Sequence, residues 1–542
     1  MLGSVLSVAV LWFTSIPLGI PGEWTWDRVP VEPDFAWNVC GGTVAAAFFV
    51  LYVCLGNRRF GTNSHPLKSI EVTAWLLGLV VGSYLWIWIV QEVAPVKNRL
   101  GKSAFVLYYA NSSGYFTRAR YDEPEARKLL AGYEDLMRQG DVLHTGTHPP
   151  GLFLAFHGLL AACEASPALS SFLDATQPAS FREATDVIAS NNLRRRVPRP
   201  LMPLDKRVLW LATLLVLSSA SLTVLPLFGL LRRTCSLQIA WLGASLWPSL
   251  PALAIFIPKS DALFPLIGLC LLWCWLTAWD NRSLVLSAVS GLIAWLGLIC
   301  SLAFMPVLVQ AFLLSVVATT VFPAIIPPSE ATFEDGRRRL FSQIDIRRLL
   351  CITAAVLGFV GPTFLMWFTV KINLFQVWWL NYHNHAGFYE QYPRTYVKWL
   401  LVNPVELLFS AGWPIAFLSA SICLSTCLDL YRKVAVYWNQ SKQIAPHLDQ
   451  RKAINTSSVV VSTMLVWGLL WMTGKNSGEA ARLWIIFLPW LVWLAGIQLG
   501  RLTEGDLTST RIVRTIVFLL MTQFLVSLLT VSRVSGFHSE SG

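Results

Sequence analysis

Carboxylates and imidazoles gather in one polar stretch of an otherwise apolar chain. The stretch covers residues 121–151 and reads YDEPEARKLLAGYEDLMRQGDVLHTGTHPPG. It contains the acidic pair Asp122 and Glu123 and two histidines, His144 and His148. A carboxylate can take a proton from a hydroxyl group, and an imidazole can hydrogen-bond to an anion. Because polar residues at a membrane edge are costly unless they have a function, this stretch is a candidate site.

Each of these side chains also has a simpler interpretation. Asp122 stands two residues before Pro124 and could cap a helix that begins there, since Asp ahead of a first-turn proline is a common helix start. His144 and His148 have the four-residue spacing of metal ligands on a helix, but the following Pro149 favours extended backbone. We expect hydrogen bonding rather than a metal site, and the sequence leaves a divalent cation open as a cofactor.

The composition is that of a membrane protein. The 542 residues are 55% hydrophobic and 13% charged, with a mean hydropathy of +0.54. Apolar segments of about 18–25 residues recur from end to end, and each could cross a hydrocarbon core as an α-helix. The net charge of +11 comes mostly from loops, where it orients a membrane protein, so we expect no nucleic-acid partner. We predict an all-α polytopic bundle of about 13 spans in one domain, residues 1–542.

The predicted spans follow the apolar segments. The sequence does not decide whether helix 149–164 crosses fully or is a shorter element packed inside the bundle. The other predicted spans are 2–20, 37–56, 72–92, 208–231, 236–257, 262–279, 284–302, 304–327, 349–370, 401–425, 456–473, 482–500 and 513–532.

The charges of the loops orient this bundle. Loop 21–36 is acidic, whereas loop 57–70 carries three Lys and Arg residues and no acid. Because cytoplasmic loops are enriched in Lys and Arg, we predict that the N-terminus is cytoplasmic and that loop 94–148 lies outside. Within this first large outer loop, residues 123–138 repeat Leu and Tyr at three- and four-residue steps. That pattern predicts an amphipathic helix on the membrane surface.

Two later loops, 332–348 and 428–453, are also rich in Lys and Arg, so we predict that they are cytoplasmic. Segments 371–400 and 474–481 then lie outside, together with the first large loop. The second outer loop, 371–400, and the segment 474–481 carry the other polar residues of interest.

Two charged pairs stand at the outer ends of predicted spans. Lys259 and Asp261 precede one span, and keeping them outside also leaves the basic run 194–196 there, against its charge. Glu479 precedes another span, and Arg482 stands just inside it, three residues later. They could form an ion pair that anchors the helix end, or Glu479 could orient the guanidinium toward an anion. Snorkelling at the interface would also explain Lys259.

Further polar residues lie in the same predicted outer segments. His383 and His385 alternate in NYHNHAGFY as on an extended strand or loop, beside aromatic residues. Such a surface could bind a sugar, although interfacial anchoring is the default for these aromatic residues. Arg394 and Lys475 are the other two cations near this face that we consider as ligands of an anion.

Three short motifs of the first outer loop occur in a recognisable order. They are Asp122-Glu123, Gly140-Asp141 and His148-Pro149-Pro150. This order and spacing resemble the first outer loop of GT-C glycosyltransferases that use polyprenyl-phosphate sugars, above all the protein O-mannosyltransferases and the lipid A aminoarabinose transferases. The segments PKSDALFPLIGLCLLW, with Asp261, and GKNSGEAARLWIIFLPW, with Arg482, are similar to helix ends of the same superfamily. A WWDYG motif is missing from the sequence, which argues against the oligosaccharyltransferase branch. We also expect no carbohydrate-binding appendix after the bundle, which weakens the likeness to protein O-mannosyltransferases specifically.

The resemblance implies a fold and a reaction. The fold would be a GT-C-like bundle in a membrane, here a bacterial plasma membrane, with its active site on the outer face. The reaction would transfer a sugar from a polyprenyl-phosphate donor to a glycan, lipid or protein acceptor with inversion. Asp122 would be the general base, and Glu123 would either orient the acceptor or be solvated. The remaining candidates would bind substrate, and they are His144, His148, Lys259, Asp261, His383, His385, Arg394, Lys475, Glu479 and Arg482.

Two other classes of protein fit the hydropathy. A lipid or sugar transporter, or a flippase, would place charges near the midplane of broken helices and would often contain repeated halves. In this chain the charges cluster near predicted span ends and the halves do not repeat, which favours the transferase. A scaffold without catalysis would use the acidic outer loop as an interaction surface.

Overall fold

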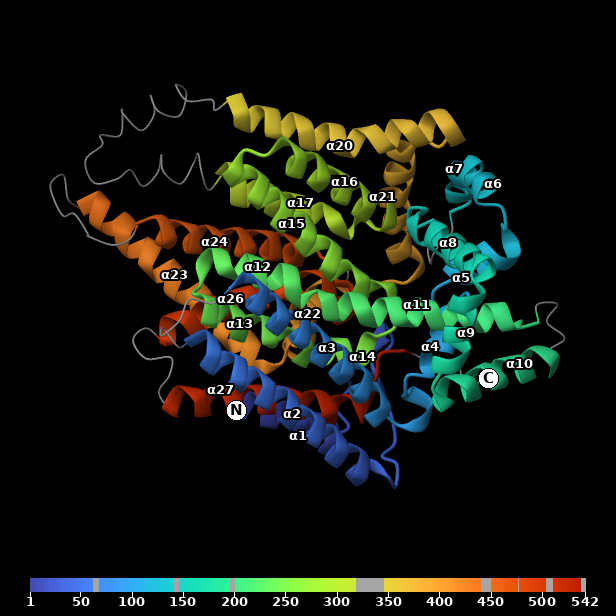
Figure 1. Cartoon of the computed structure of the whole chain (residues 1–542), viewed down its shortest axis with the longest axis horizontal. Helices are drawn as coiled ribbons and strands as arrows, with labels where there is room; N and C mark the ends of the chain where they lie inside the picture. The colour runs from blue at the N-terminus through green and yellow to red at the C-terminus, as the bar shows by residue number, and fades with distance from the viewer. Residues whose placement is uncertain are drawn as a thin grey trace.

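Apolar residues form long helices throughout the part of the chain that the structure describes. The structure is a computed structural model, and it describes residues 1–61, 68–140, 146–194, 200–317, 346–439, 450–475, 477–503 and 510–537. Helices pack side by side into a bundle, and the shorter helices α4 to α10 gather at one end of it (Figure 1).

The helices of the first part of the chain are α1 (Leu2–Phe13), α2 (Phe35–Gly61), α3 (Ser69–Val93), α4 (Lys102–Tyr108), α5 (Tyr115–Thr117), α6 (Ala126–Ala131), α7 (Tyr133–Arg138), α8 (Gly151–Ala165), α9 (Pro167–Thr176) and α10 (Ala179–Arg194). The middle part contains α11 (Pro203–Leu222), α12 (Val224–Thr234), α13 (Leu237–Ser245), α14 (Pro251–Phe256), α15 (Phe264–Asn281), α16 (Leu284–Cys300) and α17 (Met305–Phe312). The last part contains α20 (Ile346–Val370), α21 (Leu374–Gln391), α22 (Tyr396–Ala411), α23 (Trp413–Asn439), α24 (Gln450–Met472), α25 (Ala480–Leu483), α26 (Leu488–Leu502) and α27 (Thr510–Val531).

Short helical turns and four two-residue strands join these helices. The turns are η1 (Val96–Asn98), η2 (Arg118–Asp122, of π type), η3 (Trp247–Ser249), η4 (Ser260–Leu263), η5 (Leu302–Phe304), η6 (Leu313–Val317, of π type) and η7 (Ile485–Phe487). Strand β1 (Gly19–Ile20) pairs antiparallel with β2 (Trp24–Thr25), and β3 (Asp27–Arg28) pairs antiparallel with β4 (Val534–Ser535). The second pair connects the N-terminal loop to the end of α27.

The protein is an all-α integral membrane bundle. Among the described residues, 9 helices are long and apolar enough to cross a membrane, and a further four apolar helices are 10 to 17 residues long. These thirteen helices lie at the thirteen predicted spans. The undecided helix 149–164 is α8, which is bent by 103° from α9, so this pair is either a broken span or a re-entrant element. The number of actual crossings stays a prediction.

Several predicted spans differ from the helices observed; span 236–257, for example, contains α13, η3 and α14, and residues 318–327 of span 304–327 lie outside the described residues. The span 2–20 is shorter, because α1 ends at Phe13 and Arg28 donates hydrogen bonds to the carbonyl oxygens of Thr14 and Ile16 beyond it. The span 401–425 is divided at Gly412, which has a φ of +80°, into α22 and α23. A side chain at Gly412 would also collide with Gln523 of α27.

Helices α16 and α20 approach each other through two glycines. A Cβ atom at Gly291 would come within 1.9 Å of the carbonyl oxygen of Ala355, and one at Gly358 within 2.1 Å of that of Ala288. Small residues allow helix backbones to pack closely in a membrane, where the hydrophobic effect does not drive helices together. The two glycines therefore hold α20 against the bundle, although much of its remaining surface is exposed.

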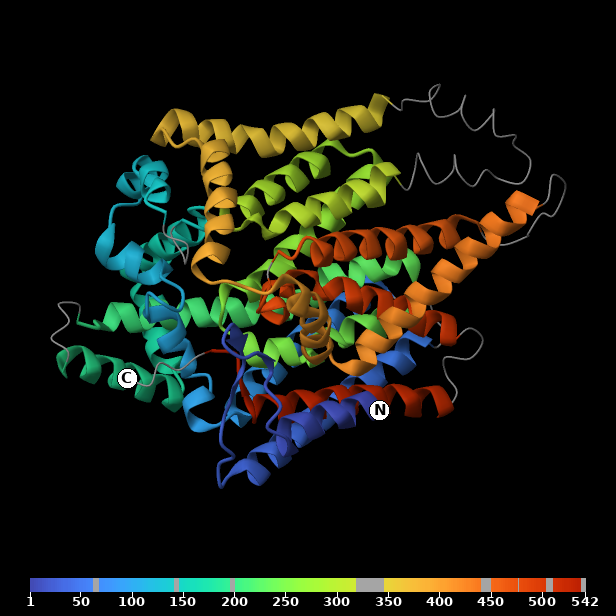
Figure 2. The same cartoon turned by 180° about the vertical axis from the view of Figure 1, so that it is seen from behind.

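The segments predicted to lie outside meet at one end of the bundle, which we call the loop end (Figures 1 and 2). The Glu23 carboxylate accepts a hydrogen bond from the Thr395 amide at 2.8 Å, and Glu134 accepts one from the Asn373 amide at 2.8 Å. The amide of Ser477 donates to the Tyr389 hydroxyl at 3.1 Å. Which side of the membrane the loop end faces is still a prediction from loop charge. The predicted cytoplasmic loops lie mostly outside the described residues.

Candidate active site at the loop end

Arg482 is held between two carboxylates at the loop end. Its guanidinium Nη2 lies 2.5 Å from Glu479 Oε2, and its Nε lies 3.8 Å from Asp261 Oδ2. All three side chains are about four-fifths buried, with exposures of 19 to 20%. Burial opposes the charge of Arg482, but Glu479 and Asp261 more than offset that effect, so the pKa of the guanidinium is raised. The group is therefore a permanent buried cation.

The backbone before α25 places Glu479 in this pair. Glu479 has a φ of +60°, a left-handed conformation that is unfavourable for a residue with a side chain. Gly474 and Gly478 also have positive φ, at +62° and +81°. This turn brings Glu479 back over the first turn of α25, where Arg482 stands three residues later. Such strain is common at functional sites and here accompanies a buried ion pair.

Lys259 and Tyr115 complete the group around Asp261. Lys259 lies in the link between α14 and η4, and its ammonium donates a hydrogen bond to the carbonyl oxygen of Ser112. Burial, with a contribution from the positive Arg482, lowers the pKa of Lys259 to about 8. Tyr115 is buried, and burial together with the negative Asp261 raises the pKa of its hydroxyl. We call Lys259, Asp261, Glu479 and Arg482 the charge cluster.

Helix α22 adds a buried acid beside the charge cluster. The Ala481 amide donates to Oε2 of Glu406 at 3.4 Å, and Glu406 is 5% exposed. Its Oε1 accepts no hydrogen bond within the described part of the chain. Glu406 was not among the predicted site residues, although a single carboxylate in an otherwise apolar segment is itself a signal of function.

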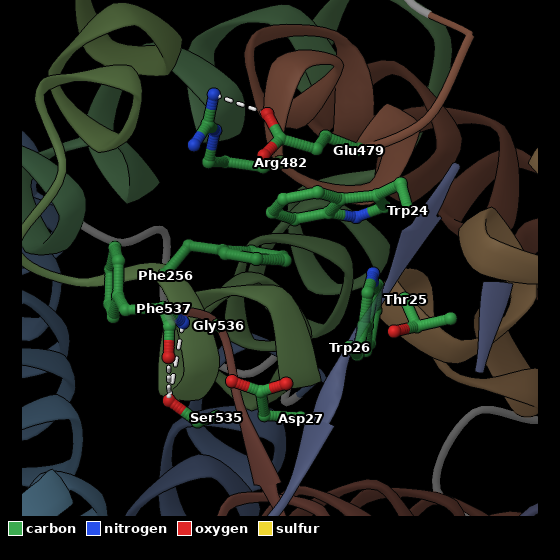
Figure 3. Close-up of a pocket in the computed structure, with 10 residues that line it drawn as sticks. All are labelled: Trp24, Thr25, Trp26, Asp27, Phe256, Glu479, Arg482, Ser535, Gly536 and Phe537. Carbon is green, nitrogen blue, oxygen red and sulfur yellow. Dashed lines mark hydrogen bonds and ion pairs between the residues drawn. The ribbon is translucent and has the colours of Figure 1, made fainter. Parts of the chain in front are cut away.

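A small recess opens next to the ion pair. Figure 3 shows Glu479 and Arg482 on one side of it and Asp27 on the other, with aromatic rings between them. The recess is built from four distant parts of the chain. Its lining residues are Trp24, Thr25, Trp26, Asp27, Phe256, Glu479, Arg482, Ser535, Gly536 and Phe537. Aromatic faces with charged groups at the rim are typical of sites that bind polar ligands with apolar faces.

Asp122 lies on the helix that leaves the charge cluster. Helix α5 begins at Tyr115 and continues as η2, which ends at Asp122. Seven residues of helix correspond to roughly 10 Å between these two positions. The Asp122 Oδ2 lies 3.9 Å from Nη1 of Arg118, and Asp122 is exposed. The adjacent Glu123 is half-buried, and its amide donates to the Arg118 carbonyl oxygen at 2.8 Å.

The structure does not support the capping interpretation of Asp122. The next helix, α6, begins at Ala126, and Glu125 occupies its N-cap position. Asp122 instead closes the preceding π-helical turn. The predicted surface helix 123–138 is also divided at Gly132, into α6 and α7.

The histidines fall in different surroundings. His144 lies outside the described residues. The His148 ring packs edge-on against Tyr115 with 5.6 Å between ring centres. The backbone carbonyl oxygen of His148 accepts a hydrogen bond from the Tyr133 hydroxyl at 2.7 Å. His148 is therefore next to the charge cluster.

The prediction of an extended strand or loop for His383 and His385 was wrong. Both belong to helix α21, whose N-cap Asn373 accepts hydrogen bonds from the Phe375 and Gln376 amides. Two residues apart on a helix, the two imidazoles point to different faces. Burial and the neighbouring Lys475 lower the pKa of His385 to about 4, so this ring is neutral at neutral pH.

The other two candidate cations have separate partners. The Lys475 ammonium lies 4.9 Å from the centre of the Tyr382 ring. Arg394 donates a hydrogen bond to the carbonyl oxygen of Glu23. The structure thus brings Lys259 and Arg482 together, whereas Lys475 packs on Tyr382 and Arg394 is bonded to Glu23. Glu23 was also not among the predicted site residues; its carboxylate accepts hydrogen bonds from Thr395 and Trp399.

A metal site is not formed by the described residues, which contain no group of three or more His, Cys, Asp or Glu side chains placed to hold an ion. Because His144 and Asp141 are outside the described residues, this observation does not bear on them. The divalent cation therefore stays an open question of the sequence.

Comparison with known proteins yields a distant likeness among solved structures. No protein-family model matches the chain, and no curated protein matches it. Among solved structures, the chain is similar to an oligosaccharyltransferase of Archaeoglobus fulgidus, in a complex with Zn and sulfate, with 12% sequence identity and a TM-score of 0.32. The match covers 66% of this chain and 45% of that chain, so this chain spans less than half of its length. A likeness at this level assigns neither fold nor activity, and function has to be argued from the residues.

Proposed function

We propose that this chain is an integral membrane glycosyltransferase that moves a sugar from a polyprenyl-phosphate donor to a hydroxyl acceptor. The observation that carries the proposal is the charge cluster, in which Arg482 and Lys259 are buried at one end of a membrane bundle. Burying such charges is costly, and they mark functional sites in membrane proteins by default. A phosphate group at the membrane surface is the anion that two such cations would bind.

The proposed reaction exchanges two bonds at the anomeric carbon of the sugar. The acceptor oxygen forms a bond to this carbon from the face opposite the phosphate, and the bond to the phosphate oxygen breaks. Asp122 takes the acceptor proton, because an alcohol is a weak nucleophile at neutral pH. The polyprenyl phosphate leaves with the bonding electrons, and Arg482 and Lys259 stabilise the negative charge that develops on it.

Two features support this assignment of roles. The first is the resemblance of the motifs at Asp122, His148 and Asp261 to those of polyprenyl-phosphate-dependent GT-C enzymes. The second is the path of the chain, since Tyr115 packs against His148 and lies on the same helical stretch as Asp122. The proposed donor site beside Tyr115 and the proposed base Asp122 would thus be connected by one continuous helix of about two turns.

The test is sugar transfer by membranes that contain the wild-type chain or the Asp122→Asn variant. The donors are radiolabelled polyprenyl-phosphate glucose, mannose and aminoarabinose, and the readout is label in a glycosylated acceptor. We expect Asp122→Asn to lower the rate about 10²- to 10⁴-fold, the usual contribution of a general base. The matched control is Glu125→Gln, which removes an exposed carboxylate three residues away.

Two results would contradict the proposal. Transfer by Asp122→Asn at the wild-type rate would remove Asp122 from the mechanism. Movement of labelled donor between the two leaflets, with no glycosylated product from any donor, would identify a flippase instead.

A further inference from the structure

Asp205 is a completely buried carboxylate at the start of α11, outside the charge cluster. Its exposure is 0%, and it occupies the third position of the helix. The Met202 amide donates to its Oδ2 at 2.8 Å, which satisfies one of the free amides at the helix N-terminus. A buried carboxylate needs several donors to offset the loss of water, so one helix-capping bond does not account for this residue.

The other donors to Asp205 come from η2. The Arg120 Nε lies 2.8 Å from Oδ1, and the Tyr121 hydroxyl donates to Oδ2 at 2.9 Å. These are the two residues that directly precede Asp122. The Tyr121 pKa is raised by burial and by the negative Asp205, so its hydroxyl stays protonated and continues to donate. One carboxylate thus fixes two consecutive side chains of the turn that carries the proposed base.

We propose that Asp205 is a positioning residue for the transfer reaction, which sets the direction of the Asp122 carboxylate by holding Arg120 and Tyr121. The inference rests on the proposed function, since it needs Asp122 to be the base. With positions 120 and 121 held against α11, the backbone at 122 is held as well, and the Asp122 carboxylate lies 3.9 Å from Arg118 of the same turn. A displacement of about 1 Å at a reacting group can cost roughly 10²-fold in rate.

The bonds from Asp205 to η2 can be removed while the hydrogen bond that caps α11 is kept. Arg120→Met combined with Tyr121→Phe deletes both η2 donors and leaves Asp205 and the Met202 amide in place. Asp205→Asn keeps an oxygen for the Met202 amide and removes the charge that attracts Arg120. Using both variants covers the case in which Asp205→Asn fails to fold.

A neighbouring ion pair supplies the matched control. Arg207 lies two residues after Asp205 on α11 and pairs with Asp174 of α9 at 2.6 Å. Asp174→Asn removes a link between α11 and an adjacent helix of the loop end without touching η2. Any general destabilisation of α11 should therefore affect the abundance or activity of this control as well.

The experiment measures kcat and the donor KM in the membrane assay, with protein abundance determined in the same membranes. We expect Arg120→Met/Tyr121→Phe, and Asp205→Asn where it folds, to lower kcat roughly tenfold to hundredfold while the donor KM changes less than about twofold. Asp174→Asn should change neither value. A purely structural role would instead lower abundance in parallel with activity in the Arg120→Met/Tyr121→Phe and Asp205→Asn variants.

The outcomes separate the inference from the function on which it rests. If Asp122→Asn abolishes transfer but the Arg120→Met/Tyr121→Phe variant has the wild-type kcat, the positioning role is refuted and the proposed function stands. If that variant loses abundance in proportion to activity, the positioning role is refuted as well. If Asp122→Asn transfers sugar at the wild-type rate, the proposed base is refuted, and the positioning role with it.

Discussion

The guanidinium of Arg482 and the carboxylate of Glu479 form a 2.5 Å ion pair across a strained turn, at the rim of the recess. In the state described here, Glu479 occupies one side of the cation that a donor phosphate would bind. Asp261 lies on another side, with 3.8 Å between its Oδ2 and the Arg482 Nε. An incoming phosphate would therefore compete with carboxylates that are already in place.

Replacing Arg482 by Lys should lower kcat/KM for the donor by about 10²-fold. Lysine keeps the positive charge but lacks the planar fork that can bind two oxygen atoms at once, and losing one donor to developing negative charge typically costs this much. The measurement is transfer at limiting donor concentration.

The control for this variant is Arg233→Lys, because Arg233 pairs with Asp280 at the end of the bundle away from the loop end. This change should leave kcat/KM unaltered. Equal losses in both variants would show that the effect of Arg482→Lys is general destabilisation rather than lost anion binding.

The donor KM should rise as the pH passes about 8. Burial lowers the pKa of Lys259 to this value, so the ammonium carries its charge below pH 8 and loses it above. If that charge binds phosphate, the donor KM should increase by roughly tenfold per pH unit once Lys259 is mostly neutral. The measurement is the donor KM between pH 6.5 and about 10.

Lys259→Arg should remove this rise of the donor KM at alkaline pH, because arginine stays protonated throughout the range. Lys398→Arg, an exchange at an exposed lysine, should leave it unchanged. A donor KM of the Lys259→Arg variant that rises as in the wild type would rule out Lys259 as the titrating group.

Replacing Gly291 by Leu should destabilise the bundle. The new side chain would collide with the backbone of α20 at Ala355, and overpacking of this kind typically costs about 1–3 kcal/mol or more. The measurement is the thermal unfolding midpoint of the purified protein in detergent. Gly361→Leu is the control on α20, because a Cβ there meets nothing within 4 Å. Similar midpoints for the two variants would contradict the close packing of α16 on α20.

The loop end should face the outside of the cell. In a background without the 10 native cysteines, Asp34→Cys at the loop end should react with a membrane-impermeant maleimide in intact cells. Asp280→Cys, at the exposed opposite end, should react only after permeabilisation. The reverse pattern would place the charge cluster on the cytoplasmic side and would invert the predicted topology.

The positions of the long helices could be predicted from hydropathy, because each apolar segment has to satisfy its own backbone hydrogen bonds in a membrane. The interruptions of these helices could not be predicted from hydropathy. The break at Gly412 depends on its contact with Gln523 of α27, and the early end of α1 depends on Arg28. Such contacts join residues far apart in the sequence, and a local pattern does not contain them.

The same distinction holds for the candidate site. Asp261 and Arg482 were accessible to prediction because each charge stands at the start of an apolar helix, where its presence is unusual. The alternation of His383 and His385 was misread, although Asn373 gave a helix-capping signal ten residues earlier. Asp27 and Asp205 carried no local signal, since their neighbours at the recess and at η2 are defined only by the fold.

The pairing of β3 with β4 has a consequence for how the protein is made. Phe537 and Ser535 line the same recess as Trp24, so its wall is incomplete until residues 534–537 have been synthesised and have reached the loop end. A nascent chain that already contains every residue of the charge cluster would still have an open site. Formation of the recess therefore depends on contact between two segments that are far apart in the sequence, and it follows synthesis of the charge cluster.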